Sequence, residues 1–121
     1  APNPNYLAAG YLLEGRYRIQ RVIGQGGFGI TYVADDLKLE QPVCIKELFV
    51  SGNCTRGSHQ SVQFQQLGDF HFQDFLRRFL QEARQLAKFR HPNIVRVYDI
   101  FEANATAYMV MEYIEGLSLQ H

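Results

Sequence analysis

The chain has 121 residues, and its 12 basic and 12 acidic side chains give no general attraction to nucleic acid or to an anionic membrane. Its 46% apolar content, with 9 Phe and 7 Tyr, is enough to pack one domain. No apolar run approaches the roughly 18 residues that cross a bilayer, and the first residues do not resemble a signal peptide, so we expect a cytoplasmic protein.

In chain order, the first expected part is an N-terminal extension, residues 1–12, that is disordered or loosely docked before a domain of residues 13–121. Three runs rich in β-branched and aromatic residues then predict an antiparallel meander. These strands lie near residues 17–23, 28–35 and 42–47.

The next segment, about residues 48–70, is rich in Ser, Gly, Gln and Asn. It exceeds the roughly 12–15 residues that loops usually reach without structure of their own, so we expect an insertion that is partly mobile or holds a short extra element. Apolar residues at three- and four-residue steps then predict an amphipathic helix over about 73–89. Strands near 95–102 and 107–112 complete an α+β fold, with a five-stranded antiparallel sheet and one main helix.

A glycine-rich turn is the most informative motif of the chain. Gly24, Gly26 and Gly29 have G-x-G-x-x-G spacing, and the residues after Gly29 (Ile-Thr-Tyr-Val) favour a strand over a helix. A dinucleotide-binding turn would open a helix instead, whose N-terminal amides hold the pyrophosphate. We therefore expect a strand–turn–strand flap whose amides approach phosphate oxygens, with Phe28 at its tip covering the site from water.

Two charged residues extend this pattern. Residues 43–46 (Val-Cys-Ile-Lys) predict a strand in which Cys44 and Lys46 share one face. Glu82 follows Phe79 on the edge of the apolar stripe of the helix, where a carboxylate is costly unless it meets a cation. Lys46 is the candidate partner, although each residue alone is better explained by a solvated position.

Together these motifs resemble the N-terminal lobe of a protein kinase, of the eukaryotic-like Ser/Thr type found in bacteria. The resemblance covers about residues 13–120. It includes the glycine turn, the strand that ends at Lys46, and Glu82 nine residues before a His-Pro-Asn-Ile-Val run at 91–95. It ends with residues 108–116 (Tyr-Met-Val-Met-Glu-Tyr-Ile-Glu-Gly), which are similar to the last strand of the lobe and the hinge, about 111–117.

The resemblance implies an ATP site. Lys46 would contact the α- and β-phosphates and Glu82 would hold that lysine, which are the two catalytic assignments. The glycine turn would cover the phosphates, the hinge backbone would bind the adenine edge, and residue 111 would be the gatekeeper behind the base. The implied cofactor-binding residues are Ile23, Gly24, Gly26, Gly27, Phe28, Gly29, Thr31, Cys44, Lys46, Met111, Glu112, Ile114 and Ser118.

Two family motifs do not occur in the chain after the hinge: the His-Arg-Asp-x-x-x-x-Asn catalytic loop and the Asp-Phe-Gly magnesium turn. We therefore expect a fragment of a kinase without its C-terminal lobe, in which the Mg²⁺ ligands and the site for the protein substrate lie outside this chain. The chain alone should bind ATP without transferring phosphate. Apolar surface at the hinge and beneath the helix predicts a homodimer or strand exchange, which sedimentation would test.

Other interpretations remain. The kinase-like fold could serve as a non-catalytic interaction scaffold, and a free-standing dinucleotide-binding domain would need a helix directly after Gly29. The spacing of Cys54, His59 and His71 matches no zinc pattern, so we expect no metal site. Cys44 has no base predicted beside it, which favours a packing role over that of a nucleophile.

Overall fold

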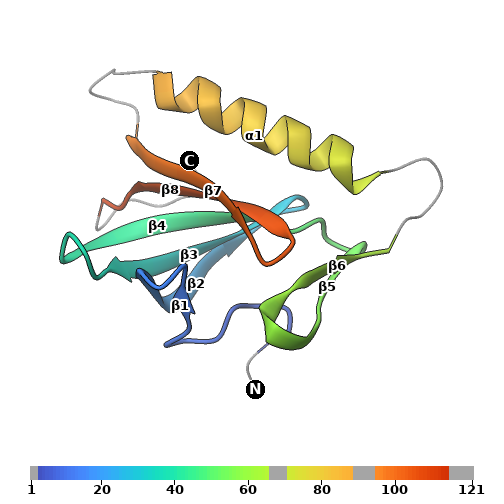
Figure 1. Ribbon diagram of the computed structural model, residues 1–121, viewed down its shortest axis with the longest axis horizontal. Coiled ribbons are helices and arrows are strands. Elements are labelled where there is room, and N and C mark those ends of the chain that lie inside the picture. The colour runs from blue at the N-terminus through green and yellow to red at the C-terminus, as the bar shows by residue number, and fades with distance from the viewer. Residues whose placement is uncertain (1–2, 66–70, 89–94, 115–121) are drawn as a thin grey trace.

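The computed structural model describes residues 3–65, 71–88 and 95–114. Six strands form one antiparallel sheet in the order β1-β2-β3-β4-β8-β7, and helix α1 lies along it (Figure 1). The strands are β1 (Leu12–Leu13), β2 (Tyr17–Gln25), β3 (Gly29–Asp36), β4 (Gln41–Leu48), β7 (Val97–Ala103) and β8 (Thr106–Glu112), and α1 is Phe72–Lys88. The α+β class and the single main helix are confirmed.

The predicted elements lie close to their expected positions. The turn between β7 and β8 has left-handed backbone at Asn104 and Ala105, with φ of 53° and 61°, which suits a two-residue hairpin. A strand, not a helix, begins at Gly29, so the dinucleotide-binding interpretation is wrong.

The N-terminal segment differs from the prediction, because it is packed on the sheet. Leu7 is only 3% exposed and its N–H donates to the Tyr32 hydroxyl at 3.1 Å. Gly10 donates to the carbonyl of Ile19 at 2.7 Å, and β1 pairs with β2 through Leu13 opposite Tyr17. This pairing adds the sixth strand. The expected disorder was wrong because the apolar residues of the segment cover a sheet face that would otherwise meet water.

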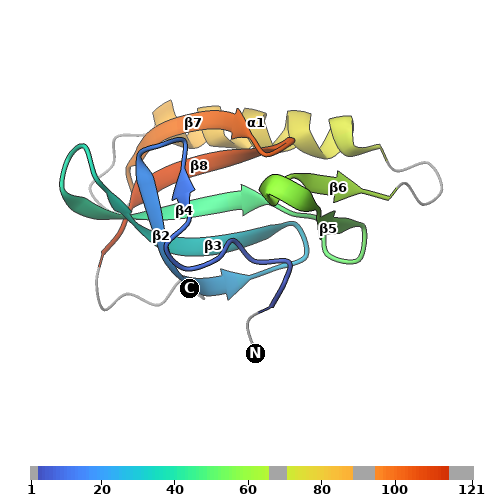
Figure 2. The same cartoon turned by 60° about the horizontal axis from the view of Figure 1, so that its bottom comes forward.

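The segment after β4 holds the extra element that its length suggested. β5 (Cys54–Arg56) and β6 (Val62–Phe64) form a separate two-stranded sheet joined by a short 3₁₀ turn, η1 (Ser58–Gln60). Figures 1 and 2 place this hairpin beside the sheet, on the side of the molecule where α1 begins. Residues 66–70 lie outside the described part of the chain.

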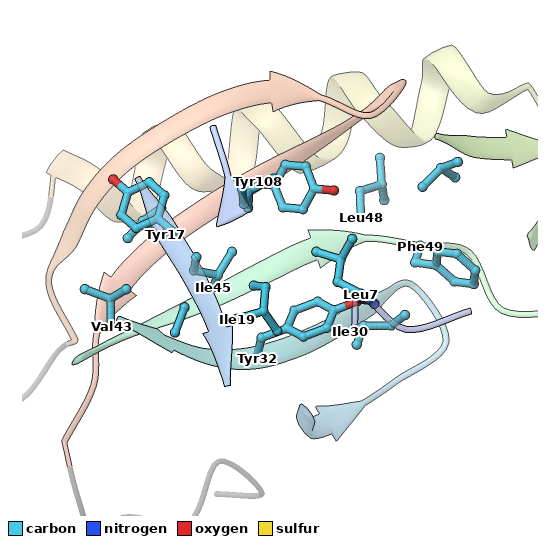
Figure 3. Close-up of a cluster of buried hydrophobic side chains, with 14 of the residues drawn as sticks. Leu7, Tyr17, Ile19, Ile30, Tyr32, Val43, Ile45, Leu48, Phe49 and Tyr108 are labelled. Carbon is cyan, nitrogen blue, oxygen red and sulfur yellow. Dashed lines mark hydrogen bonds between the residues drawn. The ribbon is translucent and has the colours of Figure 1, made fainter. Parts of the chain in front are cut away.

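The two faces of the sheet differ, as strand alternation requires. On one face, called here the core face, apolar side chains of β2, β3, β4 and β8 pack together with Leu7 of the N-terminal segment (Figure 3). Cys54 and Val62 of the hairpin belong to the same cluster. The opposite face carries Cys44 and Lys46, as predicted, with Thr31 and Met109 paired across from Lys46. The buried core includes Leu7, Leu13, Tyr17, Ile19, Ile30, Tyr32, Val43, Ile45, Leu48, Phe49, Tyr108 and Val110.

No helix in the parts of the chain that the structure describes has the length and apolarity needed to cross a membrane.

Candidate functional site

The glycine turn joins β2 and β3 and closes through a hydrogen bond from the Gly26 N–H to the Gly29 carbonyl at 2.9 Å. A Cβ at Gly29 would lie 3.0 Å from the Glu47 carbonyl oxygen and 3.1 Å from Cε of Lys46, so close packing requires glycine there. Gly26 and Gly27 have open space around them and no positive φ. Neither packing nor backbone conformation explains why these two residues are glycine. The open space beside their backbone could hold a ligand.

Lys46 lies directly beneath this turn. It is half-buried near the end of β4, with Thr31 opposite it on β3 and Met109 opposite it on β8. Its side chain passes Gly29, as the short distance to Cε shows. The strand therefore delivers an ammonium group to the glycine turn, as the sequence predicted.

A pocket of about 210 Å³ lies between the turn, β4 and α1. Lys46 and Glu82 both line it, so the structure brings the two predicted charges to one cavity. The other lining residues are Phe28, Leu48, Phe75, Arg78 and Phe79. The pocket joins elements from three distant parts of the sequence.

The expected contact between Lys46 and Glu82 is not made. None of the ion pairs among the described residues joins them, although both residues line the same pocket. Glu82 is exposed, so it needs no buried cation to solvate it, and that part of the prediction was wrong.

Phe28 forms the tip of the turn and is 62% exposed. Its ring centroid lies 5.7 Å from that of Phe75 on α1, so the turn reaches across the pocket to the helix. This position fits the predicted cover over the pocket.

Three of the residues predicted to surround a base, Thr31, Cys44 and Met111, share the face of Lys46. Cys44 lies opposite Met111 on β8 and opposite Val33 on β3, two residues from Thr31. Burial raises the pKa of the Cys44 thiol to about 11, so the thiol stays protonated at neutral pH and is a poor nucleophile. Ile23 is half-buried near the end of β2.

The hinge residues are described only in part. The N–H of Glu112 donates to the carbonyl of Arg96 at 2.8 Å, so this N–H is already used. Ile114 is exposed and follows the end of β8. Ser118 lies outside the described residues, as does most of the His-Pro-Asn-Ile-Val run.

Sequence reasoning missed a buried polar network on the core face. Glu47 follows Lys46 and is fully buried, and its Oε1 accepts hydrogen bonds from Arg56 at 2.5 Å and from Tyr32 at 2.9 Å. Its Oε2 accepts one from the Tyr108 hydroxyl at 2.5 Å. The only sequence signal was an acid at an inward-facing strand position, and nothing in the pattern identified Arg56 as its partner.

Electrostatics in this network follow from burial and from the Glu47 charge. Burial lowers the pKa of Arg56, but the carboxylate beside it raises that pKa by more, so the guanidinium stays charged. Burial, and then the negative charge of Glu47, raise the pKa of both Tyr32 and Tyr108. Both tyrosines therefore remain hydrogen-bond donors to the carboxylate.

The fold and the site define a class of protein. The family model for the protein kinase domain matches residues 17–121, and the chain belongs to this family, as its N-terminal lobe.

Bacterial Ser/Thr kinases are among its relatives. The chain is 39% identical over 114 residues to the serine/threonine-protein kinase PrkC of Bacillus subtilis, covering 94% of this chain and 15% of that protein. It is 35% identical to the serine/threonine-protein kinase PknA of Mycobacterium tuberculosis, covering 88% of this chain and 22% of that protein. A solved structure described as the apo form of PpkA-294 superposes with a TM-score of 0.84 at 38% identity, over 96% of this chain and 41% of the other. The chain thus spans less than half of each of these proteins.

Proposed function

We propose that this chain is the ATP-binding lobe of a protein Ser/Thr kinase, which transfers the γ-phosphate of ATP to protein hydroxyls. The observation that carries the proposal is the position of Lys46 beneath Gly29, at a pocket shared with Glu82. A positive charge lies under a turn in which no packing contact requires glycine at residues 26 and 27. Such a turn can bring its backbone amides close to the oxygens of a polyphosphate. Membership of the kinase family supports the same ligand.

Within this site, we assign each group the role that its position allows. Lys46 would bind the α- and β-phosphates, and the backbone of Gly24, Gly26, Gly27 and Gly29 would cover them. Phe28, which already reaches α1, would exclude water from the phosphates.

The adenine would lie farther along the same face. Cys44 and Thr31 would contact the base together with Ile23, and Met111 would stand behind it. The N–H of Glu112 is used by Arg96, so the Glu112 carbonyl and the Ile114 backbone would bind the adenine edge. Ser118 would contact the ribose.

Glu82 would stabilise Lys46 through an ion pair that this structure does not contain. Both side chains line one pocket, and we propose that the pair forms when α1 moves toward β4. We propose that bound nucleotide favours this closed arrangement, because the pair holds the lysine against the phosphates.

Mg²⁺ would neutralise charge on the β- and γ-phosphates. The described residues contain no group of three or more His, Cys, Asp or Glu side chains that could hold a metal ion. We propose that the Mg²⁺ ligands and the protein-substrate site lie in a C-terminal lobe outside this chain, because the chain spans less than half of its kinase relatives. The 121 residues alone should transfer no phosphate to a generic protein substrate in a radiolabelled-ATP assay. Self-association of this lobe stays a prediction.

Calorimetric titration with a Mg-ATP analogue tests the proposal. We expect Lys46→Met to weaken binding at least about tenfold, because it removes the cation and keeps an apolar stem of similar length. Lys38→Met is the matched control, since Lys38 is exposed in the turn between β3 and β4. The chain and both variants should also be measured inside the parent kinase, where the second lobe completes the site.

Two results would contradict the ATP-binding assignment. One is equal affinity of the wild type and Lys46→Met. The other is a folded parent protein that does not bind the analogue, which would favour the non-catalytic scaffold instead.

A further inference from the structure

We propose that the hairpin insertion, defined as residues 49–65, positions the glycine turn and α1 around Lys46, and that Phe64 is the positioning residue at its α1 end. The expected effect on nucleotide affinity rests on the proposed ATP-binding function. The contacts of the insertion do not depend on that function. The insertion contacts three elements of the site, which are β4, the glycine turn and α1.

The first contact fixes the insertion to β4. The side chain of Arg56 on β5 is 3% exposed and forms an ion pair with fully buried Glu47 at 2.5 Å. The guanidinium also donates to the carbonyl of Gln60 at 2.8 Å and to that of Asn5 at 3.1 Å. One side chain thus holds the strand, the hairpin and the N-terminal segment together, one residue away from Lys46.

The second contact fixes the start of the insertion to the glycine turn. The N–H of Phe49 donates to the carbonyl of Phe28 at 3.0 Å, and the N–H of Ser51 donates to the carbonyl of Gly27 at 2.8 Å. The carbonyls of the turn are therefore bonded to the insertion, so its tip cannot move without breaking these bonds or moving the insertion.

The third contact joins the end of the insertion to α1. The ring of Phe64 lies 5.4 Å from that of Phe72 and 6.0 Å from that of Phe75, measured between centroids. Phe75 in turn meets Phe28 at 5.7 Å. A row of aromatic rings therefore runs from β6 through the first turn of α1 to the tip of the glycine turn.

These contacts close a ring of elements around the pocket. β4 carries Lys46, the insertion is bonded to β4 through Arg56, and the insertion contacts both the turn and the helix that carries Glu82. Rigidly packed groups transmit displacements, so a shift of the hairpin changes the spacing between α1 and β4. The insertion thereby sets how readily the site closes on a nucleotide.

Hydrogen–deuterium exchange on Phe64→Ala and Phe64→Leu tests the geometry. We expect Phe64→Ala to speed amide exchange about tenfold in both the glycine turn and the first turns of α1, because both lose a shared aromatic support. Phe64→Leu keeps an apolar side chain and should show a smaller increase in the same two segments.

Phe101→Ala is the matched control. Phe101 is also half-buried and packs on two aromatic rings, those of Tyr17 and Tyr108, but it belongs to β7. A general loss of stability would raise exchange in this variant as well, whereas the proposal expects its glycine turn and α1 to exchange like those of the wild type at equal folded fraction.

Affinity for a Mg-ATP analogue, measured in the parent kinase, gives the functional consequence. Phe64→Ala should weaken binding several-fold, and Phe101→Ala should not. The proposal is overturned if Phe64→Ala and Phe101→Ala give the same exchange pattern, or if Phe64→Ala binds the analogue like the wild type. A wild type that binds no analogue would contradict the ATP-binding function instead, and the exchange result would still decide the role of the insertion.

Discussion

Lys46 and Glu47 are neighbours on β4, yet they have opposite surroundings. Glu47 is fully buried on the core face, where one guanidinium and two tyrosine hydroxyls donate to its carboxylate. Lys46 is half-buried on the other face, beside a pocket and a glycine turn, and no ion pair among the described residues includes it. One face of the strand has its charge neutralised from within the chain, whereas the other has a charge that is unpaired among the described residues and lies beside a pocket.

Under the proposed function, this difference separates the residues that stabilise the fold from those that would bind the nucleotide. A buried charge without partners is costly, so the core face must supply every hydrogen bond to Glu47 when the protein folds. On the Lys46 face the solvated lysine needs no partner, and a polyphosphate can provide one later. Substitutions on the two faces should therefore affect different properties.

Replacing Arg56 should have the largest effect on stability. Arg56→Ala leaves the Glu47 carboxylate buried without its cation, which we expect to lower the free energy of unfolding by about 3–5 kcal/mol. Urea denaturation followed by circular dichroism measures this. Arg77→Ala is the control, because its ion pair with Asp74 is exposed and should contribute about 0–1 kcal/mol. Similar losses for the two variants would mean that the buried pair does not stabilise the core face.

A second ion pair on the core face gives a smaller, pH-dependent effect. Asp36 is 2% exposed and accepts two hydrogen bonds from Arg16, at 2.9 and 2.8 Å. Arg16 lowers the pKa of Asp36 below its ordinary value of 3.8. A lowered folded-state pKa adds stability that is complete above this ordinary value and is lost as the pH falls through the folded-state pKa.

We therefore expect Asp36→Asn to lower the free energy of unfolding by about 1–2 kcal/mol at pH 7, and by progressively less in acid. Urea titrations between pH 2 and pH 7 would compare it with Asp35→Asn, whose partner Arg18 is 54% exposed. If the difference between wild type and Asp36→Asn stayed constant over this range, the carboxylate charge would not be its source.

Much of the site-bearing fold was predictable, because its signals are local. Alternation along residues 43–46 placed Lys46 on its face, and the residues after Gly29 distinguished a strand from a helix. The apolar repeat located α1 within about one residue. Each of these signals lies within one strand or within a few turns of one helix.

The features of the fold and the site that the sequence did not predict depend on contacts between segments that are distant in the sequence. Arg56 lies nine positions after Glu47 on a different strand, and Leu7 contacts Tyr32 from 25 positions away, so no periodic pattern marked either contact. The distance between Lys46 and Glu82 was equally inaccessible, since it depends on how α1 packs against β4. Sequence periodicity predicts the face of a helix but not its position along a sheet.

The smallest expected effect on stability is that of Lys46→Met. Methionine can occupy the path of the lysine stem beside Gly29, and no ion pair is lost, so we expect a change within about 0.5 kcal/mol. Ile45→Ala, one residue earlier on the core face, should cost about 2–5 kcal/mol in the same urea measurement. A loss above about 1.5 kcal/mol for Lys46→Met would place this residue among those that stabilise the fold. Its ammonium would then have a structural role, and weakened nucleotide binding in the same variant could no longer be assigned to a lost phosphate contact.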